Sequence, residues 1–337
     1  MTAAEVHADV RLIKKPELIV DDPPALTPVR SWVSVGIAAL VGALYLFRPD
    51  ATEALTVWPA WLWVVPGVLI AWKKRVAWIW TAVRWPMVAW LVVGLGLSEL
   101  WRVALPSKQA GDVRIVSVNT AGQMELAMEE AARLQPDVVL FQESATVAGL
   151  EPFVDRTFGQ DYSLVLGLDC SVLVQGRVIS QETSSTNFTF VAAELADGQR
   201  IDVVSLRMAP PWPRLDYWNP DCWRSYAEHR ASHRRELAEI WKEVQALRTG
   251  APLIFGGDFN VVPDPSVAKA ITDDLKDSYS AAGTGWYGTA MNDLPLFRID
   301  QVWASEELDA VGSRSQRSAA SDHRLVIADF EWVQGSG

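Results

Sequence analysis

Polar side chains stand at the ends of five apolar, strand-like segments of this sequence. A carboxylate beside a buried strand is costly unless it faces a site that uses its charge. Each position alone is also compatible with an ordinary turn, a strand-end cap or a buried partner of an arginine. Five such positions in one chain favour a common site, and its candidate residues are Asn119, Glu143, Asp258 with Asn260, Asp300, and Asp322 with His323.

The donor types in this set indicate a divalent metal and phosphate chemistry. Carboxylate and amide oxygens are hard ligands that suit Mg²⁺ or Mn²⁺, and one histidine without a nearby cysteine argues against a zinc site. Such an ion neutralises phosphate charge, a carboxylate aligns or deprotonates water, and a protonated imidazole stabilises the developing negative charge. The set therefore predicts hydrolysis of a phosphate ester.

The elements that must position these groups are many short strands and few helices. Residues 112–119 alternate in polarity like a strand, and residues 223–248 are the one long helix candidate. This pattern predicts an α+β fold in which helices cover sheet. The other strand-like segments are 136–142, 162–167, 171–174, 187–195, 200–206, 252–255, 299–304 and 325–332.

Five motifs in this part of the chain resemble those of the endonuclease/exonuclease/phosphatase superfamily. The resemblance implies a four-layer α+β sandwich of two mixed β-sheets flanked by helices. It also implies a hydrolase of phosphodiesterase, phosphatase or nuclease type that uses Mg²⁺ or Mn²⁺. The motifs occur in family order over most of residues 112–332, as SVNTAG at 117–122, PDVVLFQES at 136–144, GGDFN at 256–260, RIDQVW at 298–303 and SDHRLVIADF at 321–330.

The resemblance also implies which residues hold the metal and the phosphate. Glu143 would be the main metal ligand, with Asn119 and Asp322 completing the metal and phosphate environment. Many family members have a histidine after the strand that precedes the long helix, whereas this chain has Arg207. Arginine binds phosphate with two donors but cannot act as a general acid, so its expected role is substrate binding.

Four further residues are the catalytic candidates that the resemblance implies. Asp258 would position and activate the attacking water, and Asn260 would hold the water or the phosphate. His323 would contact the scissile phosphate, and Asp300 would orient this histidine and keep it protonated. An Asp–His pair favours the imidazolium in general, which agrees with this role.

The first hundred residues differ in composition from the rest of the chain. Ten of the 17 tryptophans lie between Trp32 and Trp101, and indole rings favour the membrane–water interface. We therefore expect three transmembrane helices, at about residues 31–47, 54–72 and 76–99, which would make the lipid bilayer a partner. The expected organisation is a polar N-terminus (1–30), the transmembrane region (31–101), a linker (102–111) and a catalytic domain (112–332).

Basic residues set the expected orientation. They precede the first apolar segment and separate the second from the third, whereas Arg48 alone follows the first. By the positive-inside rule the N-terminus is then cytoplasmic and the catalytic domain extracytoplasmic, in a multi-pass protein of the inner membrane. In an oxidising compartment Cys170 and Cys222 could pair or remain buried thiols, and the sequence leaves both open.

The net charge of −11 lies almost wholly on the predicted catalytic domain. Residues 102–337 contain 21 basic and 33 acidic residues, against 9 and 8 in residues 1–101. This excess of acid weighs against tight, non-specific nucleic-acid binding. The alternatives that remain are a nuclease, a phosphodiesterase directed at phospholipid headgroups, and a non-catalytic membrane sensor of a phosphorylated ligand, and no protein partner is predicted.

Overall fold

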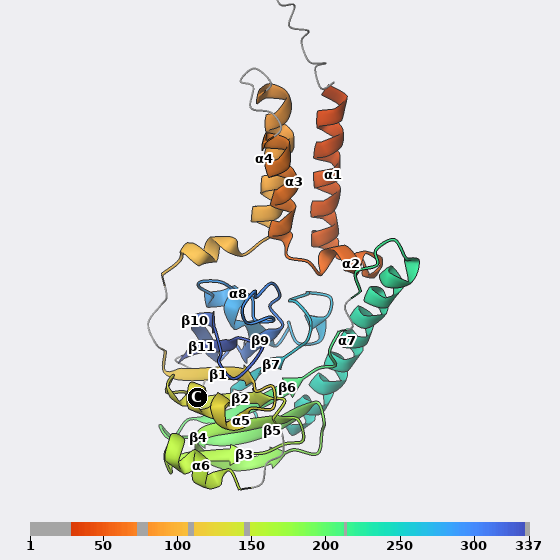
Figure 1. Ribbon diagram of the computed structural model, residues 1–337. Helices are drawn as coiled ribbons and strands as arrows, with labels where there is room; N and C mark the ends of the chain where they lie inside the picture. Colours follow the sequence, from red (N-terminus) through yellow and green to blue (C-terminus); the bar gives the residue numbers. More distant parts are fainter. Residues whose placement is uncertain (1–27, 73–79, 107–110, 145–148, 212–213, 334–337) are drawn as a thin grey trace, which may run out of the picture.

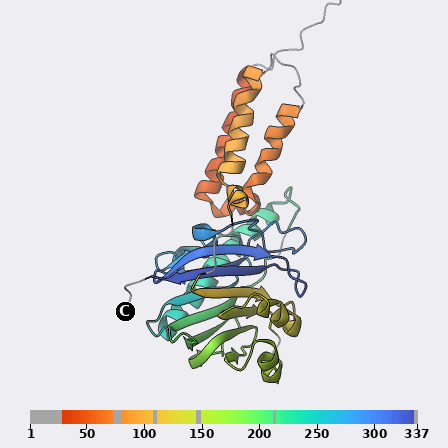
Figure 2. The same cartoon turned by 90° about the vertical axis from the view of Figure 1, so that its left-hand side faces the viewer.

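The computed structural model describes residues 28–72, 80–106, 111–144, 149–211 and 214–333. Helices at the N-terminal end stand on a larger body built around a sheet (Figure 1), and Figure 2 shows the same arrangement from the side. Parts of the predicted N-terminus (1–27), third membrane segment (76–79) and linker (107–110) lie outside the described residues.

Proline residues divide the N-terminal helical segment, which we define as the described residues between 28 and 104, into short pieces. Pro49 and Pro59 each stand directly before a 3₁₀ turn, where the fixed φ of proline suits the start of a helix. The helices are α1 (Pro28–Phe47), α2 (Glu53–Thr56), α3 (Val64–Trp72) and α4 (Trp80–Gly96), and the 3₁₀ turns are Asp50–Thr52, Ala60–Trp63 and Leu100–Ala104.

The expected membrane-spanning region is not found. Among the described residues, no helix is both long and apolar enough to cross a bilayer. The second expected span, residues 54–72, is interrupted near Pro59, and its α3 has 9 residues where about 20 are needed. The predictions of a three-helix transmembrane region and of a multi-pass inner-membrane protein with an extracytoplasmic catalytic domain are therefore wrong.

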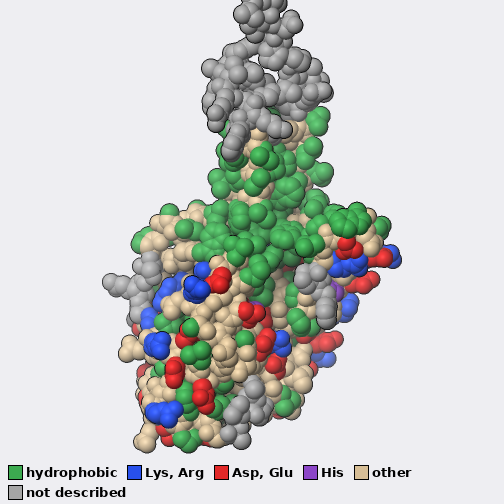
Figure 3. Space-filling view, viewed as in Figure 1, with side chains coloured by type: hydrophobic (Ala, Val, Ile, Leu, Met, Phe, Trp, Pro, Cys, Tyr) green, Lys and Arg blue, Asp and Glu red, His purple; other side chains and the backbone are tan. Residues whose placement is uncertain are grey.

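Aromatic side chains join the helical segment to the sheet-built body. Trp58 lies 5.5 Å from Phe297 between ring centroids, and its indole Nε1–H donates to the Tyr217 hydroxyl at 2.8 Å. Trp61 lies 6.1 Å from Trp286, edge to face. Figure 3 shows apolar side chains continuing from the helices onto the adjoining part of the body. Two of the tryptophans that suggested a membrane interface thus pack against protein.

The body is built on an 11-stranded mixed sheet, in which β1/β2 and β6/β7 are the parallel pairs. The strand order is β10-β11-β1-β2-β4-β5-β6-β7-β9-β8, and β3 pairs with β4 beside this path. The strands are β1 (Val113–Asn119), β2 (Val138–Gln142), β3 (Tyr162–Val165), β4 (Cys170–Glu182), β5 (Phe188–Leu195), β6 (Arg200–Arg207), β7 (Leu253–Asp258), β8 (Leu275–Asp277), β9 (Asp300–Ser305), β10 (Leu308–Gln316) and β11 (Leu325–Trp332).

This sheet is single and curled, which corrects the expected four-layer sandwich of two sheets. The 13-residue strand β4 pairs with β2 through residues 170–174 and with β5 through residues 176–182, so it carries the sheet from one half to the other. Its register shifts between Val178 and Ser180, and such a bulge bends and twists a strand. The α+β content agrees with the prediction, whereas the two separate sheets do not.

The two halves of the curled sheet share one apolar core, and helices cover their outer faces. Ile115, Leu140, Val203 and Ile254 belong to this shared core. The outer helices are α5 (Met124–Ala132) and α6 (Glu151–Thr157) on the first half and α7 (Pro220–Leu247) on the second, with the short α8 (Ser278–Ala282) beside β10. Cys170 in β4 and Cys222 in α7 are both buried, free thiols.

Candidate active site

The ends of neighbouring strands bring the predicted residues into one site. In the sheet register, Arg207 of β6 lies opposite Asp258 of β7, and Asp258 lies opposite Asp300 of β9. Asn119 ends β1, and Glu143 follows the neighbouring strand β2 directly. The curl of the sheet then places the end of β1 against the end of β7, because the Asn119 side chain reaches Asp258.

Asp258 is the hydrogen-bonded centre of this site and is 1% exposed. Its Oδ2 accepts hydrogen bonds from Nδ2 of Asn119 and Nδ2 of Asn260, each at 3.2 Å, and its Oδ1 accepts from the backbone N–H of Asn260 at 3.0 Å. Burial, followed by repulsion from Asp300, raises the pKa of Asp258 above its ordinary value. A carboxylate with a raised pKa is a better proton acceptor near neutral pH.

His323 and Asp300 form a close pair beside Asp258. Nδ1 of the imidazole lies 2.9 Å from Oδ2 and 3.2 Å from Oδ1 of Asp300. Burial lowers the pKa of His323, but the carboxylates, Asp300 first and then Asp258 and Asp322, outweigh burial and raise it to about 10. The ring is therefore protonated at neutral pH, with Nδ1–H donated to Asp300 and Nε2–H as its second donor.

Arg207 joins two carboxylates on the other side of the site. Its guanidinium donates to Oε1 of Glu143 at 2.9 Å and to Oδ2 of Asp169 at 3.0 Å. Oε1 of Glu143 also accepts from Nδ2 of Asn119 at 3.1 Å. Glu143 is thus linked to the Asp258 centre through Asn119, and Arg207 is held where its charge faces the same site.

Asp322, the third predicted metal ligand, is placed differently from Glu143 and Asn119. Its side chain is exposed, and its backbone carbonyl accepts a hydrogen bond from the Asn292 N–H at 2.6 Å. Its carboxylate acts on the site through its charge, as one of the groups that raise the pKa of His323. The structure thus brings Glu143 and Asn119 into contact and leaves Asp322 at the exposed edge.

Two residues of the site have backbone conformations that side chains rarely adopt. Glu143 and Asn260 both have φ of +52°, in the left-handed region. Asparagine tolerates this region better than glutamate, and such conformations persist only where surrounding contacts hold them. Glu143 directly follows β2 and Asn260 stands two residues after the end of β7, so each unusual conformation lies where the chain turns away from a strand.

Two groups of described side chains have the donors for a metal ion. Asp258, Asp300 and His323 have ligand atoms within 4.8 Å of one another, but a protonated His323 repels a cation. Glu143 supplies carboxylate oxygens and its side chain is 35% exposed, whereas Asn119 is buried and its Oδ1 accepts from the Ala121 N–H at 3.0 Å. A carboxylate that remains accessible to solvent suits a hard divalent ion, so Glu143, with Asn119 beside it, is the better fit.

Two residues of the site were missed in the sequence. Asp169 stands directly before β4, so the same signal, an acid at a strand end, identifies it in retrospect. Thr289 accepts hydrogen bonds at Oγ1 from the backbone N–H groups of Ile299 and Asp300, at 3.0 and 3.1 Å. It fixes the start of β9 and hence Asp300, and no sequence pattern indicates that contact.

The sequence matches the model of the Endonuclease/Exonuclease/phosphatase family over residues 116–323. The chain therefore belongs to this family, as its motifs predicted, and the matched range contains every predicted site residue. Members of the family hydrolyse phosphate esters and generally depend on divalent metal ions. No curated protein gives a significant sequence match.

Two solved structures of this family have a similar fold at low sequence identity, and a third solved structure is similar with a lower score. One from Bacteroides thetaiotaomicron is 14% identical with a TM-score of 0.51, over 66% of this chain and 96% of that chain. One from Bacteroides vulgatus is 14% identical with a TM-score of 0.50, over 66% and 99%. A mannosyl-6-phosphatase of B. thetaiotaomicron is 15% identical with a TM-score of 0.47, over 65% and 99%.

Proposed function

We propose that this protein is a Mg²⁺- or Mn²⁺-dependent hydrolase of phosphate esters that uses water as the nucleophile. The observation that carries the proposal is the joint geometry of Asp258 and His323. A buried carboxylate held by two asparagines lies beside an imidazolium held by Asp300, and Glu143 with Asn119 lies across the same site. A proton acceptor, a cationic donor and oxygen ligands are the groups that this reaction requires.

Asp258 accepts the proton of the attacking water in the proposed mechanism. Its raised pKa favours this transfer, and Asn119 and Asn260 fix the direction of its lone pairs. A Mg²⁺ or Mn²⁺ ion held by Glu143 and Asn119, with Asp322 near the exposed edge, would offset charge on the phosphate and its leaving oxygen. The carboxylate–asparagine contacts thus orient the water for in-line attack.

His323 and Arg207 stabilise negative charge on the phosphate. The imidazolium is held by Asp300, so its Nε2–H is the donor for a phosphate oxygen. Arg207 remains charged at all relevant pH values and provides a second cationic contact, but it does not protonate a leaving group. Leaving groups that need little protonation are therefore expected to react fastest.

Hydrolysis of bis-p-nitrophenyl phosphate with Mg²⁺ or Mn²⁺ tests the proposal. The wild-type chain should release p-nitrophenol, EDTA should abolish the reaction, and renewed metal should restore it. Asp258→Ala and His323→Ala should each lower kcat by about a hundredfold or more, the usual contribution of an acid–base group. His229→Gln, on α7, is the matched control and should keep full activity. Equal turnover by the wild type and both alanine variants would show that the proposed hydrolase function is wrong.

A panel of substrates then distinguishes the possible functions that are all compatible with the chemistry of this site. Plasmid DNA and phospholipid vesicles offered to the same preparation distinguish a nuclease from a headgroup-directed phosphodiesterase, and p-nitrophenyl phosphate reports monoesterase activity. Binding of inorganic phosphate without turnover of any ester would instead support a non-catalytic sensor of phosphorylated ligands. The site is common to these functions, so the fold alone does not choose among them.

A further inference from the structure

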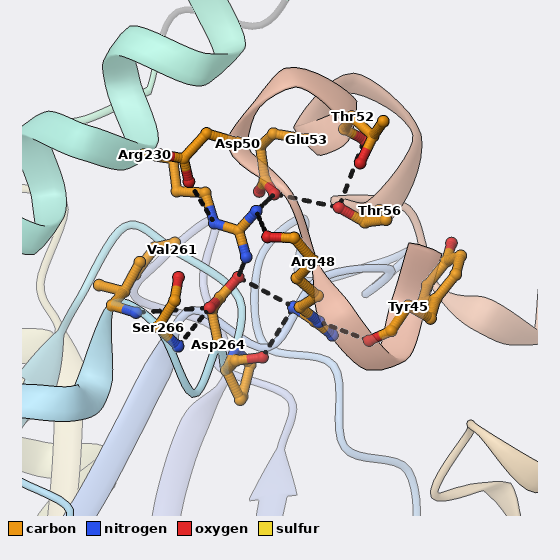
Figure 4. Close-up of polar contacts among 12 residues, drawn as sticks. Tyr45, Arg48, Asp50, Thr52, Glu53, Thr56, Arg230, Val261, Asp264 and Ser266 are labelled. Atoms are coloured by element: carbon orange, nitrogen blue, oxygen red, sulfur yellow. Dashed lines mark hydrogen bonds and ion pairs between the residues drawn. The ribbon is translucent and has the colours of Figure 1, made fainter. Parts of the chain in front are cut away.

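A cluster of buried charges joins the helical segment to the loop that follows the catalytic strand β7 (Figure 4). Arg230 lies near the middle of α7 and is 1% exposed, although it is a charged residue. Its guanidinium contacts the carboxylate of Asp264 and lies 3.1 Å from Oε2 of Glu53 in α2. It also donates to the backbone carbonyl of Arg48 at 2.6 Å, so one side chain binds both parts of the chain.

Arg48 makes a second connection from the end of α1 to the same loop. Its Nη1 donates to the Pro263 carbonyl at 3.1 Å and to Oδ2 of Asp264 at 3.3 Å. Oδ1 of Asp264 accepts from the backbone N–H groups of Ser266 at 2.7 Å and Val267 at 3.3 Å. Asp264 therefore ties its own turn to both arginines.

The loop that these arginines hold, residues 261–264, begins directly after Asn260 of the active site. On its other side, Nε2 of Gln301 donates to the Val261 carbonyl at 2.9 Å, and Gln301 is the neighbour of Asp300 in β9. The loop is thus fixed from β9 on one side and from the helical segment on the other. Asn260 lies between this fixed loop and Asp258 and has a positive φ. Such a backbone conformation persists only where the surrounding structure holds it.

Displacement of the helical segment would remove Glu53, the Arg48 guanidinium and the Arg48 carbonyl from the cluster, and would leave Arg230 and Asp264 only each other. Glu53 and Asp264 are both buried, and α2 and the Arg48 carbonyl cover Arg230 on the side away from the loop. A buried charge is strongly unfavourable without its partner. Docking of the helical segment and the ordered position of the 261–264 loop are therefore parts of one arrangement.

We propose that Arg48 and Arg230 are positioning residues for the catalytic loop, and that the helical segment is thereby a working part of the active site. They act through Asp264 and Pro263 on Asn260, and through Asn260 on Asp258. The inference rests on the proposed function, because the loop positions groups of that site. The proposed phosphate contacts come from Arg207 at the end of β6 and from His323 just before β11, so loss of positioning affects the chemical step more than substrate binding.

Steady-state kinetics of full-length Arg48→Met with bis-p-nitrophenyl phosphate tests this proposal. We expect kcat to fall about tenfold or more, since small misplacements of catalytic groups cost up to about a hundredfold, while KM changes less than about twofold. Arg48→Lys should recover much of kcat because it restores a donor to Pro263 and Asp264. Arg234→Met is the matched control, because Arg234 pairs with Asp50 at an exposed position, both side chains being about 40% exposed. Wild-type kcat in a folded Arg48→Met would overturn the proposal.

A version of the cluster without its three most buried charges tests whether the loss of kcat in Arg48→Met comes from unfolding. Glu53→Gln, Arg230→Met and Asp264→Asn combined remove one positive and two negative charges while nearly preserving side-chain volume, which buried ion pairs often tolerate. This variant should fold, as judged by its melting temperature, and lose kcat like Arg48→Met. If it folds and keeps wild-type kcat, the proposal is wrong.

Amide hydrogen exchange gives a readout that needs no activity. A peptide covering residues 259–267 should exchange faster in Arg48→Met than in wild type or in Arg234→Met. If this peptide exchanged equally fast in all three proteins, the proposed positioning role of Arg48 would be wrong, even if Arg48→Met had a reduced kcat. Absence of turnover by the wild type would instead overturn the proposed function, so the two failures are distinguishable.

Discussion

At the scale of the residue, the environment of His323 strongly raises the pKa of its imidazole. Its pKa of about 10 in the folded state lies above the ordinary histidine value of about 6.5. The stabilisation from its contact with Asp300 is therefore fully present below pH 6.5 and is lost as the pH rises through about 10. The pKa of Asp258 is also raised, to about 7, so ionisation of this buried carboxyl destabilises the folded state as the pH rises. This loss of stability occurs at lower pH than the loss caused by deprotonation of His323.

Urea unfolding of the metal-free protein between pH 6 and pH 10.5 measures this effect. His323→Gln should lower the free energy of unfolding at pH 6 by about 2 kcal/mol or more, and its difference from wild type should shrink toward pH 10.5. His229→Gln is the control, because burial lowers the pKa of His229 and the residue is neutral over most of this range. A difference that stays constant with pH would contradict the protonated His323.

The sequence predicts most of the site because each residue ends an apolar strand. Asn119, Glu143, Asp258 and Asp300 stand out by that rule, and the family motifs assign their roles. The contact of Arg207 with Asp169 is different, since these residues are brought together only by the order of β4, β5 and β6 in the sheet. A pairing set by sheet order has no local signature, and neither does the Thr289 contact with β9.

At the scale of the element, β7 is packed too closely for any side chain at its Gly256–Gly257 pair. A Cβ at Gly257, where φ is +139°, would lie 2.0 Å from the Leu206 carbonyl oxygen of β6. A Cβ at Gly256 would lie 2.9 Å from both the Gln301 carbonyl oxygen and Cδ1 of Leu140. The two glycines thus let β7 lie close to its neighbours, immediately before Asp258.

Gly257→Ala should therefore destabilise the protein by about 3 kcal/mol or more, combining an unfavourable φ with a backbone clash. Gly250→Ala is the matched control: Gly250 also has a positive φ, +89°, but no atom lies within 4 Å of its Cβ position. It should cost only about 1 kcal/mol, the strain of the conformation itself. Chemical denaturation of both variants measures the difference, and equal losses would contradict close packing of β7.

The family resemblance implied two sheets, and strand β4 is the element that joins the two halves into one sheet in the structure. Only residues 171–174 were predicted as strand, because residues 170–174 are wholly buried whereas the second part of the strand mixes exposed and half-buried positions. A strand whose surroundings change along its length has no single polarity pattern.

The long helix was easier to predict from the sequence than β4. It was predicted at 223–248 and is found at Pro220–Leu247, with the Asn219 side chain capping its start.

At the scale of the whole molecule, tryptophans and apolar runs pointed to a membrane, but the described contacts point to the body. Trp58 and Trp61 pack on aromatic residues of the body, and Arg102 donates to the carbonyls of Ser280 and Gly283. Composition records how apolar a segment is but not what covers it. The N-terminal prediction failed because, among the described residues, no helix is both long and apolar enough to cross a bilayer.

Net charge makes a prediction about polyanions that concerns the whole molecule. The chain carries −11, so a nucleic acid meets overall repulsion, while the cationic groups Arg207 and His323 act only within the site. Salt screens charges over about 30 Å at 0.01 M and about 8 Å at 0.15 M, which weakens the distant repulsion more than the local attraction. Proteins that bind nucleic acid through a basic face show the opposite trend, because salt weakens their binding.

Inhibition of bis-p-nitrophenyl phosphate hydrolysis by a short single-stranded DNA measures that trend. At fixed metal concentration, raising KCl from 10 to 150 mM should leave the inhibition constant of the DNA unchanged or lower it by roughly twofold. Inorganic phosphate is the control, since it is small enough to report the local groups with little of the distant field. A DNA inhibition constant that rises at least tenfold with salt would contradict the prediction and show that a local basic surface dominates. The direction in which the DNA inhibition constant changes with salt therefore distinguishes binding through the local site from binding through a basic surface. The net charge of −11 favours binding through the local site.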